Sequence, residues 1–223
     1  MCAVIGIQMK QADVGLIQRI FQQSMIRGKH ATGISYVVDG VLQTFKESVP
    51  SEEVLDTFDL NRVIDSDGSV SLIGHIRYST SDLRYNQPFS NGQISIVHNG
   101  VISQEPPDKW CYKTETKNDS ELILRALEND KNPLTFFRPS SMAVIELHAS
   151  KMIWAYRNEA RPLWKTVFND SDVVFTSTKD IALRAGLVNP QKCEMFRQYS
   201  AQRTIMDMHR DFIEENQIKD LQR

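Results

Sequence analysis

The sequence predicts an α+β protein in which antiparallel sheet packs against helices. Most segments with strand character occur in pairs that are separated by short turns, and two segments with helical periodicity interrupt them. Hydrophobic residues make up 41% of the 223 residues, which is ordinary for a globular protein that can fill a sizeable core. This length fits one large domain or two small ones.

The first predicted elements are a strand, a helix and a hairpin. Residues 2–8 form a short apolar run that is typical of a buried strand. Residues 13–26 carry apolar side chains three and four positions apart, which predicts an amphipathic helix. Residues 33–38 and 41–45 flank an Asp-Gly pair, and this dipeptide favours a tight primed turn between two strands.

The middle of the chain is predicted to alternate strands with a loop. Residues 51–58 indicate a short helix, and residues 70–76 and 93–98 indicate strands. The polar stretch 77–92 contains Asn, Pro and Gly in turn-forming pairs, so we predict a loop there.

A second long helix is predicted to begin at Asn118. An apolar periodic run follows this residue, and Glu121 stands three positions later, as in a capping box. The elements predicted beyond it are a hairpin over 141–147 and 151–156, a strand over 172–177, a helix over 179–185 that Gly186 ends, and a strand over 203–208. We expect residues 1–208 to form the domain and residues 209–223 to form a charged C-terminal helix or tail.

Charge and hydropathy argue against several classes of partner. The net charge of −2 argues against a basic nucleic-acid-binding face that covers the whole protein. No apolar run approaches 18 residues, so no membrane span is expected. The N-terminus lacks a basic region followed by a long apolar stretch, so no signal peptide is expected.

The cysteines and histidines indicate neither a disulfide framework nor a metal site. Cys2, Cys111 and Cys193 are far apart and form no Cys-x-x-Cys pair, which is typical of a chain in the reducing cytoplasm. His148 and His209 are isolated, so no metal-ligand spacing is present and no cofactor is indicated.

Cys2 directly follows the initiator methionine. Methionine aminopeptidases remove Met1 when the next side chain is small, and the chain would then begin with Cys2. A thiolate is a strong nucleophile, and an α-amine titrates near pH 7.7–8.0 in model peptides, which suits a general base. One residue would thus carry both groups, whereas a retained Met1 would block the amine. Alternatively, Cys2 is simply a small hydrophobic residue at a strand start.

Four polar clusters lie at predicted strand ends, in loops or at a helix start. They span residues 27–33, 74–80, 98–100 and 118–121. Taken singly, each has a structural interpretation: Asn-Gly is a common turn, and Asp119 can support a helix N-terminus through the macrodipole.

Taken together and in this order behind Cys2, the clusters resemble the class-II glutamine amidotransferases, whose glutaminase domain is an N-terminal-nucleophile hydrolase. The matching segments are Cys2-Ala-Val-Ile-Gly, Arg27-Gly with Gly33, 74–80, 86–89, 96–100, 119–121, 157–163 and 175–180, within residues 2–186. They are most similar to the glutaminase domains of phosphoribosylpyrophosphate amidotransferase and glucosamine-6-phosphate synthase. The resemblance implies a four-layer αββα sandwich with two mainly antiparallel sheets.

The resemblance also implies a catalytic mechanism. The Cys2 sulfur would attack the side-chain amide of glutamine and form a thioester, which water hydrolyses to glutamate after ammonia has left. The Asn99 side-chain amide and the Gly100 backbone N–H would stabilise the oxyanion. Glycine lets the backbone approach the oxyanion without a Cβ.

The same resemblance implies a set of residues that bind glutamine. Arg77 would hold the carboxylate with two parallel hydrogen bonds, and Asp119 would hold the ammonium. Thr80 would support the loop that closes over glutamine, and Arg27 would order a loop near Cys2.

Three positions depart from the pattern of the family. His30 stands where the family usually has an acidic residue, so it either alters the pH dependence and the contacts around the cysteine or is a tolerated structural change. Gln87 and Phe89 replace histidines that some members carry, which favours the phosphoribosyl-type branch.

The partner expected from the sequence is a separate synthetase or transferase subunit that accepts the ammonia, because 223 residues leave no room for a second catalytic domain. Two alternatives remain: hydrolysis of a γ-glutamyl peptide or conjugate, and a catalytically silent regulatory module. Cys2, Arg77, Asn99 and Asp119 are all intact, which argues against the silent module.

Overall fold

The computed structural model describes residues 1–79, 83–169 and 171–201. The strands are β1 (Ala3–Met9), β2 (Ala31–Val38), β3 (Val41–Glu47), β4 (Val70–Arg77), β5 (Phe89–Ser90), β6 (Ile94–Val101), β7 (Ser141–His148), β8 (Ile153–Arg157), β9 (Trp164–Phe168), β10 (Asp172–Thr176), β11 (Gln191–Lys192) and β12 (Gln198–Ser200). The helices are α1 (Val14–Ser24), α2 (Ser51–Thr57), α3 (Glu121–Glu128), α4 (Pro133–Phe136) and α5 (Lys179–Arg184), with 3₁₀ turns at Met25–Arg27, Leu60–Val63 and Pro107–Lys109.

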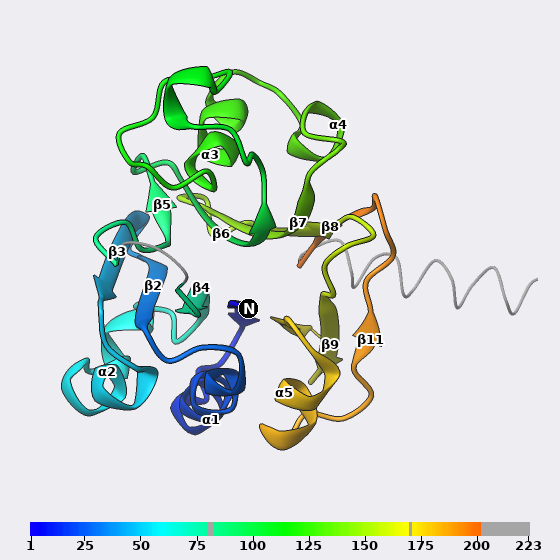
Figure 1. Cartoon of the computed structure of the whole chain (residues 1–223). Coiled ribbons are helices and arrows are strands. Elements are labelled where there is room, and N and C mark those ends of the chain that lie inside the picture. Colours follow the sequence, from blue (N-terminus) through cyan, green and yellow to red (C-terminus); the bar gives the residue numbers. More distant parts are fainter. Residues whose placement is uncertain (80–82, 170, 202–223) are drawn as a thin grey trace, which may run out of the picture.

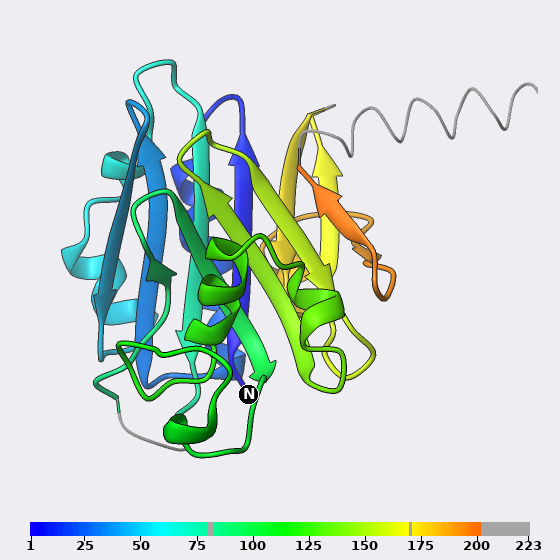
Figure 2. The same ribbon diagram turned by 90° about the horizontal axis from the view of Figure 1, so that it is seen from above.

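The strands form two sheets that pack face to face. The 7-stranded sheet has the order β11-β9-β10-β1-β4-β2-β3, the 5-stranded sheet has the order β12-β8-β7-β6-β5, and the pairings within both are antiparallel. Helices α1, α2 and α5 cover the outer face of the first sheet, and α3 and α4 cover that of the second (Figures 1 and 2). The predicted four-layer α+β sandwich is confirmed.

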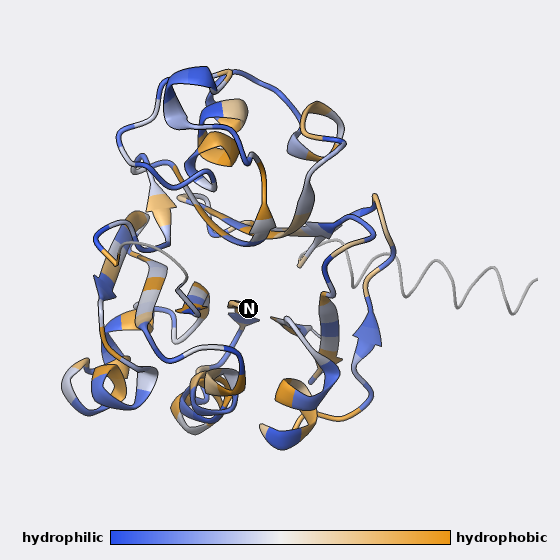
Figure 3. Ribbon diagram, viewed as in Figure 1, coloured by the Kyte–Doolittle hydropathy of each residue, from blue (hydrophilic) through white to orange (hydrophobic). Residues whose placement is uncertain are grey.

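Apolar side chains fill the three interfaces between these layers. Strand β1 shows how one strand serves two of them: Ile5 and Ile7 pack toward the helices, whereas Val4 packs between the sheets. The third apolar cluster lies between α3 and the five-stranded sheet. Polar residues gather in the loops and on the outer helix faces, as the hydropathy colouring shows (Figure 3). Side chains alternate between the two faces of a strand, so every second residue of each strand faces the other sheet.

The pairing of β1 with β4 sets the position of the polar residues between the sheets. Ala3 pairs with Ile76 and Val4 pairs with His75. Continued by one residue, this register sets Cys2 opposite Arg77. Residues that pair across antiparallel strands lie on the same face of the sheet, so Cys2, His75 and Arg77 all lie on the face that meets the second sheet.

Several predicted turns and ends are confirmed by the backbone. Asp39 and Gly40 both have positive φ, 50° and 74°, as a primed turn between two strands requires. Gly186 has a φ of 95° directly after α5, where glycine commonly ends a helix. No helix in the described ranges is both long and apolar enough to cross a membrane.

The predicted start of the second long helix is wrong. Helix α3 begins at Glu121 instead of following directly on Asn118. The Glu121 carboxylate accepts hydrogen bonds from the backbone N–H groups of Glu115 and Thr116, both at 2.8 Å, and these bonds fold the preceding loop against the helix. The Glu121 carboxylate therefore bonds the loop before the helix instead of forming the predicted capping box.

The sequence analysis also missed several short elements. Strand β9 follows Pro162 and carries mixed polar and apolar residues, and β5 and β11 are two residues long, too short for any periodic signal. Helix α4 is a single turn that begins at Pro133. The predicted strand over 203–208 and the tail over 209–223 lie outside the described residues, so the domain boundary remains a prediction.

A glycine in β2 tests how tightly the layers pack. A Cβ at Gly33 would collide with the backbone oxygen of Gln87, whereas a Cβ at Gly15 would meet only side-chain atoms, of Arg19 at 3.3 Å and of Asp13 at 3.4 Å. We expect Gly33→Ala to lower the free energy of unfolding by about 1–3 kcal/mol. Gly15→Ala should raise it by up to about 1 kcal/mol, because alanine favours helix. Urea denaturation measures both, and equal effects of the two substitutions would contradict this packing.

Candidate active site

A pocket of about 570 Å³ opens at the N-terminal end of β1, at one end of the sandwich. Strands β4 and β6 and the loops that follow them form its walls. The residues that line it are Cys2, His75, Arg77, Tyr78, Arg84, Tyr85, Gln87, His98, Gly100, Val101, Ser103, Glu105, Pro107, Trp110, Lys117, Asn118, Asp119 and Ser120. Residues from three of the four sequence clusters therefore meet in one place.

Cys2 lies half-buried directly before β1. Its Sγ is 3.8 Å from the backbone oxygen of Tyr78, and its own carbonyl accepts a hydrogen bond of 2.8 Å from the Nε of Arg27. The side chain of Met1 is exposed. The backbone around the thiol is therefore fixed on both sides, while the residue that precedes it projects toward solvent.

Arg77 ends β4 and is buried with its guanidinium in the pocket wall. Its Nη1 donates to the backbone oxygen of Tyr85 at 3.2 Å and to the Oδ1 of Asn86 at 2.6 Å. These bonds fix the plane of the guanidinium, which is the group best suited to bind a carboxylate with parallel hydrogen bonds.

Asn99 and Gly100 lie near the end of β6. Asn99 is buried, and its Nδ2 has no hydrogen-bond partner among the described residues. Such an unsatisfied buried donor costs about 1–3 kcal/mol, so it is an unusual feature outside a functional site. A Cβ at position 100 would collide with the backbone oxygen of Ser141, which explains why glycine stands there.

Asp119 lies in the loop before α3 and is half-buried in the pocket wall. Its Oδ2 accepts hydrogen bonds from the backbone N–H groups of Ile102 at 2.6 Å and of Ser103 at 3.1 Å. Its Oδ1 makes no hydrogen bond to any described residue. One carboxylate oxygen therefore holds the loop, and the other is available to a cation.

A buried network that the sequence analysis did not predict joins β6 to the start of α3. The Nε2 of Gln87 donates to the backbone oxygen of His98 and to the Oγ of Ser120, both at 3.1 Å. The Nδ1 of His98 lies 2.8 Å from the same Oγ. The network keeps Asn99 and Asp119 at a fixed separation. The members of this network are more than ten residues apart in the sequence, so no local sequence pattern could predict it.

Two buried histidines lie beside this network. Burial, together with the positive charge of the neighbouring Arg77, lowers the pKa of His75 to about 3. Burial likewise lowers the pKa of His98 to about 4, against an opposing effect of Asp119. Both rings are therefore neutral at pH 7 and add no positive charge to the pocket.

Two arginines lie close to the N-terminus of the chain. Burial lowers the pKa of Arg27, and its Nη2 is buried without a hydrogen-bond partner in the described structure. The sequence analysis assigned no role to Arg161, yet its Nε is likewise buried and unpartnered, and its Nη1 lies 3.9 Å from the sulfur of Met1. The only sequence signal for Arg161 was its place in the segment 157–163.

The remaining predicted residues are placed as follows. Thr80 lies outside the described residues. Cys111 is exposed, and burial raises the pKa of Cys193 to about 12, so that thiol stays protonated. Within the described ranges, no group of three or more His, Cys, Asp or Glu residues could hold a metal ion.

Comparison with curated proteins relates this chain to sugar aminotransferases. No protein-family model matches it. The glutamine–fructose-6-phosphate aminotransferase (isomerizing) of Staphylococcus aureus is 28% identical over 141 residues, which covers 59% of this chain and 23% of the relative. The enzyme of the same name from Sulfurisphaera tokodaii is 25% identical over 205 residues, which covers 84% of this chain and 32% of that enzyme.

Solved structures show which fold this is. The Bacillus subtilis glutamine phosphoribosylpyrophosphate amidotransferase superposes with a TM-score of 0.72 at 18% identity, over 89% of this chain and 47% of that chain. A glutamine aminotransferase class-II domain protein from Silicibacter pomeroyi superposes with a TM-score of 0.52 at 9% identity, over 90% of this chain and 94% of that chain. The chain has the fold of a class-II glutamine amidotransferase domain.

The predicted resemblance to N-terminal-nucleophile glutaminase domains is thereby confirmed. This chain spans between about a quarter and a third of the length of the curated relatives. The similarity therefore concerns one domain of those proteins.

The two buried histidines predict an acid-sensitive fold. As pH falls from 6.5 toward 4, the unfolded chain binds protons at both rings, whereas the folded chain keeps them neutral. We expect each histidine to lower the free energy of unfolding by on the order of 1 kcal/mol per pH unit over this range. Urea denaturation between pH 7 and pH 4 should show a shallower pH slope for His98→Gln than for the wild type. An unchanged slope in His98→Gln would contradict the conclusion that His98 stays neutral in the folded chain.

Proposed function

We propose that this domain hydrolyses the side-chain amide of glutamine to glutamate and ammonia, with Cys2 as the nucleophile. The single observation that carries the proposal is the pocket at the head of β1. It combines a cysteine thiol, a fixed guanidinium and a carboxylate oxygen that has no partner among the described residues. The fold that this chain shares with glutamine amidotransferase domains supports the same activity.

The charges of the pocket match the backbone groups of an amino acid. The Arg77 guanidinium, held by Tyr85 and Asn86, would bind the α-carboxylate of glutamine. The Oδ1 of Asp119 would accept from the α-ammonium, since its Oδ2 already holds the loop. A ligand bound at both points would extend its side-chain amide toward the thiol.

The reaction begins with the attack of the Cys2 sulfur on the amide carbon, which moves the carbonyl π-electrons onto oxygen. The α-amine of Cys2, once Met1 has been removed, would take the thiol proton and pass it to the leaving nitrogen. Collapse of the tetrahedral intermediate breaks the C–N bond and releases ammonia. Water then attacks the thioester, which gives glutamate and restores the thiol.

Asn99 and Gly100 would stabilise the oxyanion of this intermediate. The Nδ2 of Asn99 is buried and unsatisfied in the structure, so its lost hydrogen bond would be recovered when a negative oxygen forms beside it. This arrangement binds the transition state more strongly than the substrate, as catalysis requires. The two buried histidines are neutral and are not needed as bases in this scheme.

The ammonia would be consumed by a separate domain or subunit. Each curated relative carries, in its name, an aminotransferase activity on fructose 6-phosphate, and this chain covers only a part of it. We propose a synthetase or transferase as the acceptor. A cytoplasmic location is part of the proposal and agrees with three cysteines that are all unpaired.

The first test compares two cysteine substitutions. Protein whose intact mass shows that Met1 has been removed should release glutamate from glutamine, and Cys2→Ala should abolish this release, because it removes the nucleophile. Cys111→Ala should retain full activity, because Cys111 is exposed and does not line the pocket. Activity in Cys2→Ala would refute the proposal. A parallel assay with γ-glutamyl peptides decides whether glutamine is the preferred substrate.

The second test separates binding from catalysis. Asn99→Ala should lower kcat about 10²- to 10³-fold with little change in KM, because an oxyanion donor acts mainly in the transition state. Arg77→Lys should instead raise KM, because lysine cannot form two parallel hydrogen bonds to a carboxylate. Steady-state kinetics with glutamine measures both. An Asn99→Ala variant with unchanged kcat would exclude it from the oxyanion site.

A further inference from the structure

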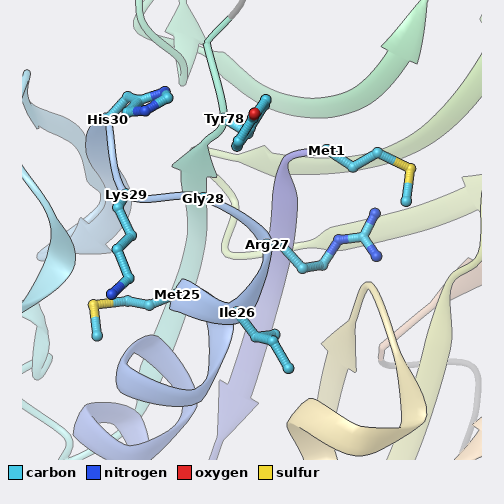
Figure 4. A pocket seen from close by; sticks show the side chains of 8 residues that line it. All are labelled: Met1, Met25, Ile26, Arg27, Gly28, Lys29, His30 and Tyr78. Atoms are coloured by element: carbon cyan, nitrogen blue, oxygen red, sulfur yellow. The ribbon is translucent and has the colours of Figure 1, made fainter.

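A second hollow of about 420 Å³ lies beside Cys2, next to the pocket described above. The segment 25–30, Met1 and Tyr78 line it, and Tyr78 lines both pockets (Figure 4). The ring of His30 points toward that of Tyr78, with 5.2 Å between the centroids and 37° between the planes (Figure 4). His30 thus packs against Tyr78, the residue whose backbone oxygen the Cys2 thiol contacts.

His30 contacts the backbone on both sides of Tyr78. Its backbone N–H donates to the carbonyl oxygen of Arg77 at 3.0 Å, and its Nδ1 accepts from the backbone N–H of Ser79 at 2.8 Å. The carbonyl oxygen of Tyr78, between these two bonds, is the group that lies 3.8 Å from the Sγ of Cys2. We refer to the two bonds as the His30 clamp.

We propose that His30 is a positioning residue of the glutaminase site, whose neutral imidazole holds the Tyr78–Ser79 backbone against the nucleophile. This inference rests on the proposed function. The clamp acts at the point where β4 leaves the sheet, directly after Arg77. Loosening it would shift the carbonyl beside Cys2 and the guanidinium that is proposed to bind glutamine.

The clamp depends on the protonation state of the imidazole. An imidazole nitrogen accepts a hydrogen bond only when it is unprotonated, so the proton of neutral His30 must be on Nε2. Protonation would place an N–H group against the N–H of Ser79 and break the bond. Histidine is the side chain that ordinarily changes charge between pH 5 and pH 8, so a pH series over this range tests whether the clamp needs a neutral ring.

The groups around His30 offer no counter-charge to an imidazolium. The charged side chains that line the hollow are those of Lys29 and Arg27, and no carboxylate lines it among the described residues. The side chains of Lys29 and Arg27 both point away from the imidazole (Figure 4). Tyr78 is the remaining titratable neighbour, and its ring packs against the imidazole.

The test uses substitutions that keep or remove the acceptor. The Oδ1 of asparagine can take the place of Nδ1 without titrating, so His30→Asn should retain the clamp at every pH, whereas His30→Ala should lose it. In the wild type, KM for glutamine should rise about fivefold between pH 8 and pH 5.5, the effect of one lost hydrogen bond. His30→Asn should not show this rise, and His30→Ala should have the high KM throughout.

A second readout does not depend on turnover. Hydrogen exchange of the Ser79 amide, measured by NMR and corrected for the intrinsic effect of pH, should show protection in the wild type at pH 8 that is lost at pH 5.5. His30→Asn should keep the protection at both pH values. Lys29→Ala is the matched control, because its side chain points away from the clamp, and it should behave as the wild type does.

Two results would overturn the proposal. One is equal Ser79 protection in His30→Ala and the wild type, and the other is a rise of KM in acid that persists in His30→Asn. If the wild type does not turn over glutamine, the proposed function fails, and the exchange experiment still decides whether His30 holds the Tyr78–Ser79 backbone.

Discussion

Strand β1 pairs with β4 on one side and with β10 on the other, and this double pairing fixes the orientation of Cys2. Because side chains alternate along a strand, a shift of register by one residue would turn Cys2 toward the helices and Ala3 toward the second sheet. The apolar contacts of Ile5 and Ile7 beneath α1 oppose such a shift. The position of the Cys2 thiol is therefore determined by core packing along the whole strand.

The rest of the site is contributed by the second sheet and the loops that join it to α3. Asn99 lies on β6 and Asp119 lies before α3, and the buried hydrogen bonds of Gln87 with His98 and Ser120 connect the two. Buried polar groups are costly unless they are paired, so this network has few alternative arrangements. Such rigidity suits a site in which a thiol, a guanidinium and a carboxylate must keep fixed distances.

The sequence predicted the elements whose signals are local. A short apolar run indicated β1, helical periodicity indicated α1, and Asp39-Gly40 and Gly186 marked a turn and a helix end. The start of α3 was mispredicted because Glu121 bonds the loop before it instead of its own cap. The motifs singled out Cys2, Arg77 and Asp119, which line one pocket in the structure. The hydrogen bonds of Gln87 and the burial of the Arg161 Nε depend on contacts between distant segments. No spacing along the chain carries that information.

The proposed reaction begins when Cys2, freed of Met1, attacks the amide carbon of a bound glutamine. Its most direct test is covalent labelling by a glutamine analogue that carries a diazoketone in place of the side-chain amide, followed by peptide mass spectrometry. We expect one adduct, on the Cys2 sulfur, with loss of dinitrogen and with protection by excess glutamine. Labelling of Cys111 alone, or no labelling of processed protein that is correctly folded, would contradict it.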